Sequence, residues 1–249
     1  MRHVVTAFKE KVAYNKDEFI VVFLFSVILG FLFSAKTLFT EAHHVFVSDF
    51  IITSAVALII VFFFTLVMKM TGVVTGVYPI VTVSHFWLVV AVILALMSRG
   101  FIIIFIPPGF LLHASNRMLL GRKPGEPGLR EQTMMAVLSI CSLIVLALFV
   151  DSMNIHSQVQ GTFVSMAYMY AIYSLVPFDF ATKMMFENDE GATCGAVIFF
   201  KSRTIFVFMI LFVLASLIGL FADGYIVWAA FAFIIAFLGA IIYYFKSEF

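Results

Sequence analysis

Seven apolar runs of about twenty residues each constrain this chain more than any other feature of its sequence. A helix needs about 20 apolar residues to cross a bilayer core about 30 Å thick. Of the 249 residues, 63% are hydrophobic and 12% are charged, whereas about 25% are charged in a soluble domain. The mean hydropathy is +1.13. The predicted spans are Phe19–Phe39, Phe50–Met70, Pro79–Met97, Gln132–Val150, Gln158–Phe178, Thr204–Phe221 and Tyr225–Phe245.

This pattern predicts an all-α fold, a polytopic transmembrane helix bundle with about seven spans and one short broken or re-entrant segment. The whole chain, 1–249, then forms a single integral membrane domain. Residues 1–18 mix apolar and charged positions, which favours an interfacial N-terminal helix. The run Phe19–Phe39 is too long for a signal peptide and no small-residue cleavage site follows it, so we expect a retained first span.

The broken segment is Phe101–His113, which has only 13 residues and contains Pro107, Pro108 and Gly109. A half-helix, an extended return and a re-entrant segment all fit this pattern. Irregular backbone at membrane depth persists only where protein buries it or where it lines a water-filled cavity. We therefore predict that this segment lies at the centre of the bundle, between Pro79–Met97 and Gln132–Val150, and that its two prolines and glycine are functional candidates.

The main chain of this segment needs hydrogen-bond partners. Proline has no N–H and disrupts regular helix geometry, which frees carbonyl groups around Ile103 and Ile104. Hydroxyl groups on neighbouring spans, or ordered water, can donate to such carbonyls. The candidates are Ser139, Ser142 and Thr162.

Basic residues are distributed very unevenly between the two predicted sides of the membrane. If the N-terminus is cytoplasmic and Phe101–His113 returns the chain, 13 of the 15 lysines and arginines lie inside. Only Lys36 and Arg99 lie outside. The positive-inside rule then predicts a protein of the cytoplasmic membrane with both termini cytoplasmic. The loops 113–131 and 179–203 are predicted to be cytoplasmic as well.

Few residues in the sequence suggest chemistry. The predicted spans contain no Asp or Glu, which argues against an ion-coupled transporter, and His85 is the only ionisable residue near the middle of a span. The predicted outer loop contains possible ligands for a divalent metal. These are Glu41, His43, His44 and Asp49. Adjacent histidines point apart, however, and four polar residues are ordinary in a solvated loop.

We therefore predict no cofactor and no catalytic residues. HExxH, GxSxG, CxxC and phosphate-binding loops are all absent, so nothing pairs a nucleophile with a base. The two cysteines, Cys141 and Cys194, suit packing positions. A net charge of +1 gives no basic field for nucleic acid. The expected partners are the lipid bilayer and other membrane proteins.

Five stretches, in order, resemble the site-2 protease family of M50-type intramembrane zinc metalloproteases, specifically its archaeal branch. FKEKVAYNKDEFIVVFLFSVILGFLFS is similar to the lead-in and first span. FTLVMKMTGVVTGVYP lies where the family has its HExxH helix, and SRGFIIIFIPPGF resembles the Pro-Gly element. GLREQTMMAVLSICSL resembles the helix with the Ala-Gly-Pro…Asn signature, and YSLVPFDFATKMMF resembles the element that supplies the third zinc ligand.

The chain departs from the family at the residues that carry the chemistry. Phe64, Thr65 and Met68 occupy the positions of His, Glu and His, and none of them can bind zinc or act as the general base. In the stretch YSLVPFDFATKMMF, which resembles the element with the third zinc ligand, Pro177 and Phe178 remain, but the Leu-Asp-Gly of the family does not. The resemblance therefore implies a pseudo-protease with degenerate zinc and catalytic motifs.

Three interpretations of function stay open. The first is a catalytically inactive site-2-protease-like protein that binds another membrane protein or serves as a subunit of a membrane complex. The second is a small transporter or channel that uses the broken segment 101–113. The third is an active metalloprotease with non-standard ligands.

Overall fold

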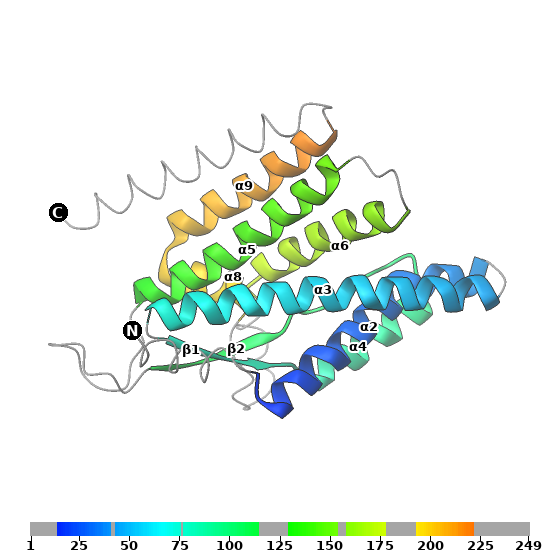
Figure 1. The fold of residues 1–249 in the computed structure, drawn as a ribbon, viewed down its shortest axis with the longest axis horizontal. Coiled ribbons are helices and arrows are strands. Elements are labelled where there is room, and N and C mark those ends of the chain that lie inside the picture. The colour runs from blue at the N-terminus through cyan, green and yellow to red at the C-terminus, as the bar shows by residue number, and fades with distance from the viewer. Residues whose placement is uncertain are drawn as a thin grey trace, which may run out of the picture.

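The computed structural model describes residues 14–40, 43–75, 77–114, 129–153, 158–177 and 193–221. Within these ranges the chain is mainly helical, with one two-stranded sheet (Figure 1). The elements, labelled as in Figure 1, are α2 (Lys16–Thr40), α3 (His43–Thr75), β1 (Val77–Thr82), α4 (His85–Met97), β2 (Gly109–Ala114), α5 (Leu129–Ser152), α6 (Gln158–Leu175), α8 (Cys194–Lys201) and α9 (Arg203–Phe221).

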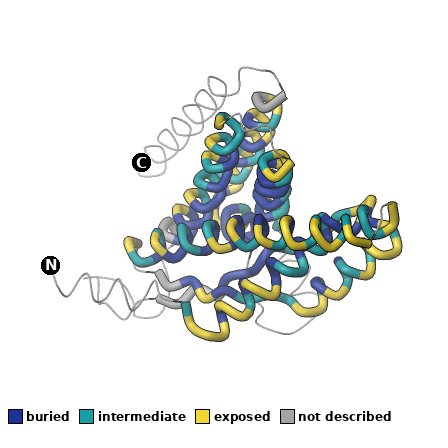
Figure 2. The backbone as a smooth tube through the Cα atoms, turned by 45° about the vertical axis from the view of Figure 1, so that its right-hand side comes forward, coloured by how far each residue is buried: buried dark blue, intermediate teal, exposed yellow. Residues whose placement is uncertain are grey.

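The long helix α3 lies between two groups of helices (Figure 1). On one side it packs along α2, which also contacts α4; on the other side it contacts α5 and α6. α2 and α3 approach each other so closely at Gly30 that a Cβ atom there would collide with Ser54. Figure 2 shows the buried residues on the facing sides of these helices and exposed residues on their outer sides. The outer sides are apolar as well, with Ile51 and Val89 more than half exposed.

Three described helices are long and apolar enough to cross a membrane. They cover Lys16–Thr40, His43–Val74 and Gln132–Ser152. Two further apolar helices are shorter, His85–Met97 and Arg203–Ile218. The helices also begin earlier than the predicted spans, since α2 starts at Lys16 and α3 at His43. The predicted span Tyr225–Phe245 lies outside the described residues.

The predicted span Pro79–Met97 is wrong as a single helix. Its first part is strand β1, and only His85–Met97 is helical, as α4. β1 pairs antiparallel with β2, so that Val77 lies opposite Ala114 and Thr82 opposite Gly109. Residues 77–114 therefore form a closed excursion whose two ends lie side by side, next to α2 and α3.

The broken segment is an extended return, one of the three predicted forms. After α4 the chain turns at Arg99 and Gly100, both with positive φ, and residues 102–108 form no helix before β2 begins. Thirteen residues make only about 20 Å of helix, but an extended chain rises about 3.3 Å per residue and covers about twice that distance. The return thus runs back alongside β1 and α4 with few residues.

Several predicted loop boundaries also change. Residues 16–18, predicted as interfacial, belong to α2, and the rest of the predicted interfacial helix up to residue 13 lies outside the described residues. The predicted outer loop is helical from His43 onward, which places Asp49 inside α3. The predicted cytoplasmic loops contain structure at their edges, because β2 ends at Ala114, α5 begins at Leu129 and α8 covers Cys194–Lys201.

Candidate functional site

The centre of the bundle is an aromatic cluster around Tyr170 of α6. Its ring lies 5.1 Å from the Phe64 ring of α3, 6.3 Å from Phe25 of α2 and 6.1 Å from Phe105 of the extended return. Tyr173 stands beside Phe105, with 4.6 Å between ring centroids. Four segments of the chain therefore meet at one point, and the return is fixed there by aromatic packing.

The extended return is buried at this centre, and its neighbours are partly those predicted. Its strand β2 pairs with β1, which begins the predicted flanking segment Pro79–Met97. Phe105, however, packs on α2 and α6, where Gln132–Val150 was expected as the second neighbour. Pro107, Pro108 and Gly109 are all buried. Since proline has no N–H, the two prolines leave two fewer donors to satisfy in this buried stretch.

The carbonyl predicted to need a donor does receive one, from a different residue. Tyr173 Oη donates to Ile103 O at 2.7 Å. The predicted donors, Ser139, Ser142 and Thr162, donate instead to carbonyls of their own helices. Serine and threonine often return their hydroxyl proton to the preceding helical turn, so they were poor candidates for a distant carbonyl. For the main-chain groups of Ile104 and Phe105, the described part of the chain provides no hydrogen-bond partner.

The three residues at the would-be zinc and base positions are closed into this core. Phe64 and Thr65 are fully buried and Met68 is 1% exposed. The ring of Phe64 lies between Tyr170 and Phe110 of β2, 6.3 Å from the latter. Thr65 Oγ1 donates to Val61 O at 2.8 Å. These side chains fill space and provide no group that can activate water.

A charged cluster, made of Tyr14, Glu18, Thr65, Lys69 and the Val81 N–H, lies next to these residues. Lys69 Nζ donates to Glu18 Oε2 at 2.5 Å, and the two side chains are only 5% and 9% exposed. Glu18 Oε2 also accepts from the Asn15 N–H at 3.0 Å, and Glu18 Oε1 accepts from the Val81 N–H at 3.2 Å. One carboxylate therefore connects the start of α2, the last part of α3 and the edge of β1.

Tyr14 covers the ion pair. Lys69 Nζ lies 4.3 Å from the centre of the Tyr14 ring, which is a favourable cation–π arrangement. Tyr14 Oη forms a 2.6 Å hydrogen bond with Thr65 Oγ1. Burial raises the pKa of Tyr14 to about 12, with the Glu18 charge adding to the rise and the Thr65 hydrogen bond opposing it. Tyr14 is therefore neutral at physiological pH.

The sequence contained a signal for this pair that was missed. Glu18 lies just before the first predicted span and Lys69 near the end of the second, so an antiparallel hairpin brings them to the same level. The two positions are 51 residues apart, and the register of the α2–α3 hairpin is needed before they can be paired.

The metal-ligand candidates of the predicted outer loop are not brought together. His43 and His44 are exposed at the start of α3, Asp49 faces a cavity more than a helical turn further on, and Glu41 lies outside the described residues. Among the residues that the structure describes, no group of three or more His, Cys, Asp or Glu side chains could hold a metal ion. His85, expected near the middle of a span, is instead the exposed first residue of α4.

No family model matches this chain, and no curated protein or solved structure matches it either. The described residues bring together a buried ion pair, an aromatic centre and an extended main chain with unmet hydrogen bonds. Such an arrangement holds segments far apart in the sequence in place.

Proposed function

We propose that this chain is a catalytically inactive, site-2-protease-like membrane protein that binds a segment of another membrane protein, as a binding protein or as a subunit of a membrane complex. The proposal is consistent with Phe64, Thr65 and Met68, which offer no histidine, cysteine or carboxylate for zinc and are packed into the core. A protein with such a closed site can bind a partner but cannot cleave a substrate there.

The extended return carries this proposal. The Ile102 and Ile104 side chains are 50% and 42% exposed, while Phe105 between the bundle helices is 1% exposed. An extended main chain with unmet donors and acceptors is costly in an apolar environment, and a partner segment laid beside it supplies the missing hydrogen bonds. The partner therefore binds beside residues 102–106.

We also propose the topology that the charges favour. The chain crosses the cytoplasmic membrane with seven spans, and its N-terminus, central loop and C-terminus are cytoplasmic. The 13-to-2 distribution of basic residues supports this orientation. The pairing of β1 with β2 supports it further, because an excursion that closes on itself returns the chain to the side from which it left.

Site-specific photocrosslinking tests the binding proposal. A photoreactive amino acid at Ile104 should capture a membrane protein in native membranes, whereas the same probe at Val207 on α9, 54% exposed, should capture much less of it. Equal capture at both positions would reflect random lipid-phase collisions and would contradict the proposal. Stoichiometric zinc in the purified protein would contradict the inactive state and favour a metalloprotease with non-standard ligands.

A small transporter or channel is the second candidate. It is favoured by a cavity with polar lining between α3 and α6, which contains Asp49. This cavity does not include Pro107, however. Asp49 is also separated from Lys69 of the charged cluster by twenty residues, which is about 30 Å of helix. The cavity and the charged cluster therefore lie far apart on α3. Uptake of a solute by proteoliposomes, lost on closing the cavity with Thr162→Phe, would favour this candidate over partner binding.

A further inference from the structure

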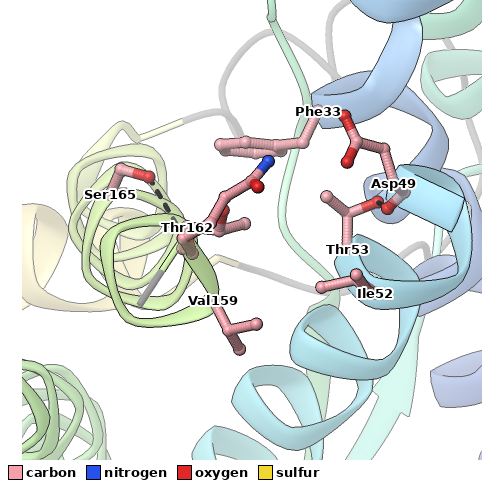
Figure 3. Close-up of a pocket in the computed structure, with 8 residues that line it drawn as sticks. Phe33, Asp49, Ile52, Thr53, Val159, Thr162 and Ser165 are labelled. Carbon is pink, nitrogen blue, oxygen red and sulfur yellow. Dashed lines mark hydrogen bonds between the residues drawn. The ribbon is translucent and has the colours of Figure 1, made fainter. Parts of the chain in front are cut away.

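The cavity between the α2–α3 hairpin and α6 is lined largely by hydrogen-bond acceptors, apart from the side-chain amide of Gln158, which can also donate. Its volume is about 270 Å³. In Figure 3, Asp49 and Thr53 of α3 face Thr162 of α6 across the opening, and the Phe33 ring of α2 lies across one end. The remaining lining residues are Ile52, Gln158, Val159 and Ser165.

The hydroxyl groups in this lining already donate their protons in hydrogen bonds to main-chain carbonyls. Thr53 Oγ1 donates to Asp49 O at 2.7 Å or Gly30 O at 2.9 Å. Thr162 Oγ1 donates to Gln158 O at 2.9 Å, and Ser165 Oγ donates to Thr162 O at 3.1 Å. A hydroxyl has one proton and two lone pairs, so these oxygens can only accept from a molecule in the cavity.

Asp49 adds a negative charge to this set of acceptors. Among the described residues its carboxylate takes part in no ion pair. The nearest cation of α2, Lys36, points elsewhere, with its Nζ 5.5 Å from the centre of the Phe101 ring. The positive end of α6 opposes a cation, but it equals only about half a charge and weakens within the first turn. The full negative charge of Asp49 therefore makes the cavity favour a positively charged ligand.

We propose that this cavity binds a primary ammonium group, with Asp49 as its counter-ion and the Thr53, Thr162 and Ser165 oxygens as acceptors. A bare alkali ion would leave most of a 270 Å³ cavity unfilled, whereas an amino alcohol occupies it and places its carbon atoms on Phe33 and Val159. The ammonium group is carried either by a free solute or by the ethanolamine headgroup of a lipid. This inference does not depend on the proposed function.

Ligand-dependent thermal unfolding of the purified full chain tests the site. Ethanolamine hydrochloride should raise the unfolding temperature saturably in detergent if the ligand is a solute. Nanodiscs with phosphatidylethanolamine, compared with phosphatidylcholine, should raise it if the ligand is a lipid. Choline chloride at equal concentration should give a smaller shift, since a quaternary ammonium has no N–H to donate.

Variants separate this site from a general effect of amines. Asp49→Asn keeps the shape and removes the charge, so the apparent affinity should fall at least about tenfold, as expected for a lost charge-assisted hydrogen bond. Thr162→Val should weaken binding less. Ser48→Ala, a neighbouring hydroxyl on α3 that does not line the cavity, should leave the shift unchanged.

Two results would contradict the proposal. If neither ethanolamine nor phosphatidylethanolamine gives a saturable shift, the cavity does not bind an ammonium group. If Asp49→Asn folds with an unchanged melting temperature but keeps the full shift, the ammonium binds elsewhere. Either result overturns the proposal.

Discussion

At the scale of single residues, two tyrosines on α6 form a matched pair. Tyr170 Oη is buried and finds no hydrogen-bond partner among the described residues, whereas Tyr173 Oη donates to Ile103 O. Tyr170→Phe removes an unsatisfied hydroxyl and keeps the ring contacts, so the free energy of unfolding should stay level or rise by about 1 kcal/mol. Tyr173→Phe should lower it by about 1–3 kcal/mol, because a carbonyl loses its donor. Denaturant unfolding in detergent measures both. A large loss of stability in Tyr170→Phe would mean that its hydroxyl is satisfied, for example by a buried water.

The ion pair gives a second prediction at this scale. Glu18→Gln keeps only one acceptor for the Asn15 and Val81 N–H groups, because an NH2 donor replaces the other oxygen, and it leaves Lys69 charged and buried. Removing one partner of a buried pair typically destabilises a protein by about 3–5 kcal/mol. The double variant Glu18→Gln/Lys69→Met should recover most of this loss, because no unpaired charge remains buried.

A double-mutant cycle on unfolding free energies checks this expectation. Asp17→Asn is the matched control, since Asp17 is exposed on the same turn of α2 and should change stability little. If the losses from Glu18→Gln and Lys69→Met simply add in the double variant, the two charges do not stabilise each other and the pair is not formed.

At the scale of elements, the extended return gives a third prediction. Pro107→Leu/Pro108→Leu introduces two N–H donors into a buried stretch, each costing about 1–3 kcal/mol if it finds no acceptor. The variant should lose more stability, and more crosslinking at Ile104, than Phe101→Leu, whose side chain is 71% exposed. Thermal unfolding and crosslinking yield measure the two effects. Equal behaviour of the two variants would show that the prolines serve no special purpose in the return.

The sequence predicted some elements well and others poorly for a physical reason. Length and apolar composition suffice for α2, α3 and α5, because a continuous apolar run of that length has few other solutions. The strand VYPIVT was missed because it precedes another apolar run, and hydropathy does not distinguish a buried strand from a buried helix. Its β-branched and aromatic residues were the available signal. The acceptor at Ile103 was predictable from Pro107, but its donor required the packing of α6.

At the scale of the whole molecule, the proposed topology gives a fourth prediction. A single cysteine placed in the 113–131 loop, in a background with Cys141 and Cys194 replaced, should resist an impermeant thiol reagent added from outside intact cells. A cysteine at Lys36, which is exposed near the opposite end of α2, should react. The basic residues inside and the closure of residues 77–114 are the reasons. Ready labelling in the 113–131 loop would overturn the orientation.

The site at this scale was only partly predictable. Sequence alone placed Pro107–Gly109 in the buried interior, and the absence of zinc chemistry at Phe64, Thr65 and Met68 stays a prediction. It could not bring Asp49 of α3 beside Thr162 of α6, because that proximity depends on how two helices far apart in the sequence pack. The charged cluster was hidden for the same reason.

The pairing of β1 with β2 has a consequence for the order of synthesis. Val77 and Ala114 are opposite each other in the sheet, yet a ribosome adding about 5–20 residues per second needs about two to seven seconds to pass from one to the other. During that interval β1 has no neighbouring strand. In the folded chain the carboxylate of Glu18, which is made earlier than either strand, accepts from the Val81 N–H. β1 thus has one contact to an earlier part of the chain that does not require β2.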